Sequence, residues 1–213
     1  MPRRRAPITP RPSRAPLVVG VLLLALVALA AVAAVALSST SSGGLDEPAR
    51  RAVVIEGSAL PAFTDPADDP AVGQPVPILS GTGLDGEPLR IGAGQGPMAI
   101  VLLAHWCSHC QAEVPVLVEY LASKGMPPGV RLVGLSSSID PTRPNYPPSA
   151  WLEREGWSVP TLVDDASSRA LAALGMTSFP GFVFVDADGR VVQRFTGEMR
   201  AATFEQAVRA LAP

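Results

Sequence analysis

Cysteine and histidine are scarce in this sequence, with two of each in 213 residues. An exported domain that relied on structural disulfides would carry more cysteines at wider spacing, and a zinc site would need two further ligands beside one cysteine pair. A lipoprotein anchor would need a cysteine just after an apolar N-terminal segment, whereas the first cysteine is Cys107. No segment repeats at a fixed period, so a repeat architecture is unsupported. The chain length allows one domain of ordinary size with accessory segments, and we expect that organisation.

Acidic residues are absent from the first part of the chain. Five arginines precede the first acid, so the remainder carries a net charge of −7 although the whole chain carries only −2. The negative charge of this remainder disfavours a nucleic-acid partner, and no run of basic residues follows Arg51. The arginine-rich head therefore needs another explanation.

An apolar stretch after the head supplies that explanation. Residues 17–37 hold 21 residues without a charged or strongly polar side chain, which matches the roughly 20 residues that a helix needs to cross a bilayer. We expect a single-pass transmembrane anchor there, with the basic head at 1–16 in the cytoplasm and everything after residue 37 outside the cell membrane. The alternative is a signal peptide that is cleaved before secretion, since Ala33, Ala34 and Ala36 offer small residues for cleavage. The stretch is longer than the roughly 7–15 residues typical of signal peptides, which favours the anchor.

Residues 38–70 have the composition of a flexible linker. Ser, Thr and Gly fill 38–44, and the stretch to residue 70 is rich in Ala, Asp and Pro with little periodicity. The apolar triplet 53–55 is weak support for a short strand within it.

Residues 71–213 alternate apolar runs with turn signals, and we expect one folded α/β domain there. The first two strands should form a small N-terminal hairpin around Asp85-Gly86, and the last two a second hairpin around 186–189. The expected strands are 76–79, 89–91, 98–104, 130–135, 161–163, 182–185 and 191–195. The expected helices are 114–121, 150–155, 167–174 and 204–211. This order predicts a central mixed sheet with helices on both faces.

The only two cysteines lie three positions apart where a buried strand gives way to a helix. Free N–H groups and the positive end of the helix dipole stabilise a thiolate at Cys107, which we predict to be the nucleophile. Cys110 lies one turn further on the same side and can attack the mixed disulfide, which closes the intramolecular bond and frees the product. The spacing therefore predicts a redox-active pair that needs no bound cofactor. The alternative is a small metal site with His105 and His109. Strand geometry disfavours it, because His105 and Cys107 would have to turn inward together at a bend.

The order of hairpin, buried strand, Trp106-Cys107-x-x-Cys110, helix, late proline and Asp-Gly hairpin resembles the thioredoxin superfamily. Within it, the chain is similar to membrane-anchored TlpA/ResA-like thiol-disulfide oxidoreductases. The resemblance implies a thioredoxin-like fold over about 72–211 and a substrate-binding cis-proline loop facing the dithiol, at Phe179-Pro180. Pro160 is a rival for that role, but only Pro180 is followed by strand, Asp-Gly turn and strand.

Several neighbours of the dithiol carry further expectations. Thioredoxin has a buried Asp six residues before its first active-site cysteine, where this chain has Val101. Another acid must then accept the proton of Cys110. We predict that Glu113, one helical turn beyond Cys110, does so, as in the TlpA/ResA-like family. Trp106 should shield the thiols and touch substrate. Between the cysteines lie Ser108 and His109, and a protonated His109 could approach the sulfur of Cys107 and stabilise its thiolate.

The resemblance predicts exchange of this dithiol with protein thiols and disulfides outside the membrane, as a disulfide reductase in cytochrome c maturation or thiol quality control. A membrane or extracytoplasmic redox partner is implied, and we expect a monomer without metal or cofactor. His109 keeps a second direction open, because oxidising members of the superfamily carry histidine there. A peroxidase is disfavoured by Ala104, where peroxiredoxins need Thr or Ser. A non-enzymatic copper-binding protein of the same fold is disfavoured by the cysteine spacing.

Overall fold

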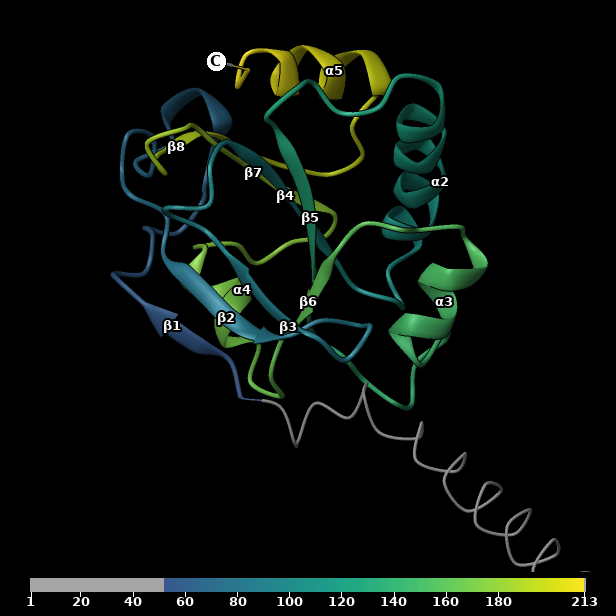
Figure 1. Cartoon of the computed structure of the whole chain (residues 1–213). Helices are drawn as coiled ribbons and strands as arrows, with labels where there is room; N and C mark the ends of the chain where they lie inside the picture. Colours follow the sequence, from purple (N-terminus) through teal and green to yellow (C-terminus); the bar gives the residue numbers. More distant parts are fainter. Residues whose placement is uncertain (1–51, 213) are drawn as a thin grey trace, which may run out of the picture. The chain divides into compact units, whose positions relative to one another are not determined.

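The computed structural model describes residues 52–212, which form two sheets and the helices around them (Figure 1). The smaller sheet is antiparallel and holds β1 (Val54–Glu56), β2 (Ile78–Thr82) and β3 (Pro88–Ile91). The larger sheet, in the spatial order β6-β5-β4-β7-β8, holds β4 (Met98–Leu103), β5 (Arg131–Ser136), β6 (Thr161–Val163), β7 (Gly181–Val185) and β8 (Val191–Thr196). The helical elements are η3 (Pro66–Asp68), α2 (Ser108–Ser123), α3 (Pro148–Arg154), α4 (Arg169–Ala173) and α5 (Ala201–Arg209).

The larger sheet is mixed, as the sequence predicts. Strand β4 runs parallel to β5 and antiparallel to β7, and β7 and β8 form the second predicted hairpin. Aspartates stabilise both hairpin turns: the Asp85 carboxylate accepts the N–H of Glu87, and the Asp186 carboxylate accepts those of Asp188 and Arg190. This is the usual reason why Asp-rich turns join two strands.

Strand β4 is buried along its whole length and divides the domain into two hydrophobic cores. Its side chains alternate, so that Ile100 and Leu102 face one core while Val101 and Leu103 face the other. The smaller sheet and α4 complete the first core, whereas α2, α3 and α5 contribute to the second (Figure 1). The chain leaves β4 towards α2, which places the cysteine pair at the edge of the second core.

The folded domain begins earlier than the predicted boundary at residue 71. Strand β1 pairs with β2, and Val53 and Leu60 are buried in the first core, so residues 52–70 are not a flexible linker. A buried ion pair between Asp69 and Arg194 of β8 fixes the end of this segment. Composition does not reveal this order, because two of the side chains that hold the segment, Arg169 and Arg194, lie more than 100 residues along the chain from their partners.

Two of the predicted segments, the basic head at 1–16 and the anchor at 17–37, lie outside the described residues, as does the first part of the linker. Between residues 52 and 212, no helix has the length and apolar character needed to cross a membrane.

Candidate active site

The two cysteines occupy different environments at the start of α2. Cys107 is the N-cap residue of the helix and is partly exposed, and its Sγ donates to the carbonyl oxygen of Phe179 at 3.6 Å. Cys110 is completely buried, and its Sγ accepts the N–H of Ala104 at 3.5 Å. One thiol can therefore meet a protein substrate, while the other faces only the interior.

Burial also sets the acidity of the inner thiol. It raises the pKa of Cys110 well above the ordinary range, and the nearby Cys107 and Glu113 side chains raise this pKa further. Cys110 thus holds its proton at neutral pH. It can act as a nucleophile only if a neighbouring group accepts that proton as the sulfur attacks.

Glu113 is the acid that lies beside Cys110. Its side chain is buried against the second core, one turn along α2, and its Oε2 accepts the N–H of Met199 at 2.7 Å. No described residue forms a hydrogen bond with its Oε1. Burial raises the pKa of Glu113 to about 7, the Met199 N–H opposes this shift, and the negative charge of Glu198 adds to it. A buried carboxylate with one open oxygen and a pKa near neutrality is suited to take a proton and return it.

Val101 lies on the α2 side of β4 and is fully buried in the same core as Cys110. Valine has no titratable group, so Val101 cannot accept the proton of Cys110.

Trp106 extends the surface beside Cys107. Its indole N–H donates to the carbonyl of Ser138 at 2.7 Å, and its ring meets the Phe179 ring edge-on at 6.1 Å between centroids. The guanidinium of Arg143 lies 4.6 Å from the centroid of the indole ring. Trp106 therefore has a fixed orientation on the rim of the site. Ser138 and Arg143 come from the proline-rich loop and carry no motif that could have identified them.

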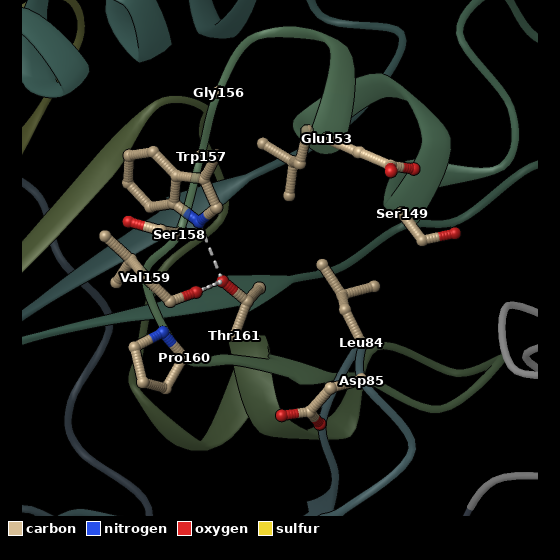
Figure 2. Close-up of a pocket in the computed structure, with 11 residues that line it drawn as sticks. Leu84, Asp85, Ser149, Glu153, Gly156, Trp157, Ser158, Val159, Pro160 and Thr161 are labelled. Carbon is tan, nitrogen blue, oxygen red and sulfur yellow. Dashed lines mark hydrogen bonds between the residues drawn. The ribbon is translucent and has the colours of Figure 1, made fainter.

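The proline loop opposite the dithiol has the predicted conformation. The Phe179-Pro180 peptide bond is cis, and the Phe179 carbonyl that precedes it receives the Cys107 thiol. The rival Pro160 lies elsewhere, in a pocket of about 490 Å³ whose lining includes Leu84, Glu153 and Trp157 but neither cysteine (Figure 2). In that pocket Thr161 accepts the indole N–H of Trp157 and donates to the Val159 carbonyl, so the segment around Pro160 is held by its own contacts (Figure 2).

His105 has a structural place that sequence reasoning missed. It is fully buried, its Nδ1 donates to the Pro144 carbonyl at 2.7 Å, and its Nε2 accepts the N–H of Asp140 at 3.2 Å. Its own carbonyl accepts from Gln111 and Asn145. The ring thereby ties the proline-rich loop to the segment that carries the dithiol, and both of its nitrogens are engaged with the backbone.

His109 and Ser108 are exposed on the first turn of α2. The Nδ1 of His109 lies 2.6 Å from Oε1 of Glu198, a residue of the loop between β8 and α5 that the sequence did not single out. The sequence led us to expect this imidazole near the sulfur of Cys107, whereas the partner that the structure gives it is the carboxylate of Glu198. Glu198 lies 89 positions away, so no local pattern connects the two.

Metal ligands do not gather around the dithiol. Among residues 52–212, no group of three or more His, Cys, Asp or Glu side chains has an arrangement that could hold a metal ion.

The fold and this dithiol define a thioredoxin-like thiol-disulfide oxidoreductase, which acts on protein thiols and disulfides. Residues 55–211 match the Redoxin family, and since this is most of the chain, the protein belongs to that family. A search of curated proteins finds no match.

Solved structures agree with this assignment. The chain is similar to a secreted Mycobacterium tuberculosis disulfide oxidoreductase homologous to E. coli DsbE, with 26% identity, a TM-score of 0.51, and coverage of 62% of this chain and 95% of that one. It is also similar to DsbF of the same organism, with 28% identity, a TM-score of 0.50 and coverage of 62% and 94%. StoA from Bacillus subtilis shares 16% identity over 64% of this chain and 98% of its own, with a TM-score of 0.52, which shows the fold alone. These neighbours are consistent with the TlpA/ResA-like resemblance.

Proposed function

We propose that this protein is a membrane-tethered disulfide reductase that works outside the cytoplasmic membrane, in cytochrome c maturation or thiol quality control. The observation that carries the chemistry is the partly exposed Cys107 next to a buried Cys110 and a buried Glu113 whose Oε1 has no described partner. The apolar stretch 17–37 behind an arginine-rich head supports the location.

The proposed reaction proceeds in two steps. The Cys107 thiolate attacks a substrate disulfide, one substrate sulfur leaves as a thiolate, and a mixed disulfide with Cys107 forms. The Cys110 thiol then passes its proton to Glu113 while its sulfur bonds to Cys107, and the second substrate sulfur leaves. The dithiol loses two electrons and the substrate disulfide gains them. In reverse, the same steps oxidise a substrate.

Two features bear on direction. A positive charge near Cys107 would stabilise its thiolate, favour the reduced enzyme and make the disulfide a stronger oxidant. His109 is the residue that could supply this charge, but the Glu198 carboxylate 2.6 Å away offsets it. This pairing supports a reductase. An oxidase is the second candidate, because His109 is exposed on the first turn of α2 between the two cysteines, where oxidising members of the superfamily carry histidine.

Trapping in cells tests the chemistry. In the full-length protein, Cys110→Ser should accumulate mixed disulfides with its substrates, whereas Cys107→Ser should form none and lose all exchange activity. Equal trapping by both variants would remove the assignment of Cys107 as nucleophile. Insulin reduction by anaerobically purified protein, together with metal analysis, separates this function from a copper-binding one.

The tether has its own test. Removal of residues 1–37 should release an active domain from the membrane, because it keeps every described residue of the two cores, from Val53 onward. An inactive truncated protein would mean that the N-terminal segment does more than set location.

A further inference from the structure

Three consecutive residues of the loop between β8 and α5 contact three different parts of the dithiol site. The contacts are Gly197 N–H to the Pro180 carbonyl at 2.8 Å, Glu198 Oε1 to His109 Nδ1 at 2.6 Å, and Met199 N–H to Glu113 Oε2 at 2.7 Å. The loop is therefore bonded at once to the cis-proline segment, the first turn of α2 and the buried acid.

These contacts differ in exposure. The side chains of His109 and Glu198 are 68% and 50% exposed, whereas Glu113 is 1% exposed. Met199 follows Glu198 directly and is buried in the same core as Cys110. The His109–Glu198 hydrogen bond thus lies on the solvent side of the loop, and Glu113 lies on its inner side.

We propose that Glu198 is a positioning residue for proton transfer in the dithiol site: its carboxylate holds His109 and so fixes the loop whose next residue, Met199, donates to Glu113. This inference rests on the proposed function only in so far as Glu113 accepts the proton of Cys110. Fixing the donor matters because Met199 N–H is the group that orients the Glu113 carboxylate and leaves Oε1 open for that proton.

The charge of Glu198 acts on the same acid. The titratable groups near Glu113 are Cys110 and His109 on its own helix and Glu198 on the facing loop, while Val101 and Met199 are neutral. A negative charge at Glu198 opposes a second one on Glu113, so it favours the protonated form of that acid. Glu198 should therefore influence both the geometry and the proton affinity of Glu113.

The test follows the two steps of exchange separately in the full-length chain, purified in detergent micelles. The reduced protein reacts with 5,5′-dithiobis(2-nitrobenzoate), a disulfide whose thiolate is coloured. The first thiolate is released when Cys107 attacks, and the second when Cys110 resolves the mixed disulfide. Stopped-flow absorbance from pH 5 to 9 gives the rate of each release. Glu119→Gln is the matched control, since Glu119 is an exposed carboxylate on α2, the helix that carries Glu113.

Two variants separate charge from position. Glu198→Gln keeps a hydrogen-bonding side chain without the charge, and we expect the midpoint of the second release to move down by roughly half a pH unit. Glu198→Ala removes the tie to His109 as well, and we expect the second release to slow by about 10-fold with the first little changed. In [13C]Glu-labelled protein, the carboxyl resonance of Glu113 should titrate at a lower pH in Glu198→Gln than in the parent.

The inference is overturned if both variants match the parent and Glu119→Gln in the second release and in the Glu113 titration. That result would leave the proposed function standing, because two releases would still occur. If the parent protein released only one thiolate, that result would count against the proposed function itself. If Glu113→Gln had a normal second release, the roles of both Glu113 and Glu198 would be overturned.

Discussion

Two buried carboxylates of this domain lie on opposite sides of its larger sheet, and protein groups satisfy them to different degrees. Asp69 faces Arg194, whose guanidinium donates to both of its oxygens and also to the carbonyls of Pro61 and Leu174. Glu113 has one backbone donor and one oxygen without a described partner. Hydrogen bonds from Arg194 lower the pKa of Asp69, whereas burial raises that of Glu113 to about 7. A satisfied buried acid holds the fold, and an unsatisfied one is available for chemistry.

The largest effect we expect comes from breaking the satisfied pair. Arg194→Met leaves Asp69 charged and unpaired in the first core, which should lower the free energy of unfolding by about 3–5 kcal/mol. Urea unfolding of the chain without residues 1–37 measures this loss. Arg209→Met is the control, since the Arg209 side chain of its pair with Glu205 is exposed and its loss should change stability far less. Equal losses would show that burial does not distinguish the two pairs.

The two acids should also give opposite dependences of stability on pH. The pKa of Glu113 is raised from its ordinary 4.5 to about 7, so the folded state holds that proton more tightly than the unfolded state does. Its contribution is complete below pH 4.5 and is lost as the pH rises to about 7, a change of up to about 3 kcal/mol. The pKa of Asp69 is lowered, so its contribution is present above pH 3.8 and is lost as the pH falls through the folded-state pKa.

Unfolding titrations of the reduced protein from about pH 2 to pH 8 test this contrast. Glu113→Gln should flatten the decline between pH 4.5 and 7, because glutamine does not ionise, and should leave the loss of stability below pH 3.8 in place. A slope that survives the substitution would have to come from another group.

Glu113→Gln should also slow the step in which Cys110 resolves the mixed disulfide. Without the carboxylate, Cys110 has no base at its side, and we expect Glu113→Gln to slow the release of the second thiolate by about 100-fold at pH 7. The remaining rate should rise only at higher pH, where the raised pKa of Cys110 is approached. Stopped-flow exchange from pH 5 to 9 checks both points. A profile like that of the parent would return Glu113 to a packing role.

Much of this contrast was accessible from the sequence, but unevenly. Strand and helix signals placed the dithiol, whereas the roles of Glu113 and Pro180 were expected from the resemblance to TlpA/ResA-like proteins. The folding of residues 52–70 was not, since Asp69 looks like one more acid in a loop until Arg194 is placed against it. Glu198 and the role of His105 were likewise hidden, because their partners lie 89 and 35 to 40 positions away and no periodic pattern links them.

The smallest effect should come from the exposed contact between His109 and Glu198. Both side chains are about half exposed or more, so water screens any charge on His109, and the Glu198 carboxylate offsets it. We therefore expect His109→Pro to make the reduction potential of the dithiol more negative by only about 10–30 mV, where 30 mV corresponds to about 1.4 kcal/mol for two electrons. The direction follows because a protonated imidazole would stabilise the Cys107 thiolate and so the reduced form. Equilibration with glutathione buffers measures the shift, with Glu119→Gln as the control and a second series at high salt, where the shift should shrink. A shift near 100 mV would mean that His109 acts on Cys107 largely unopposed, and the protein would then belong with the oxidants of its superfamily.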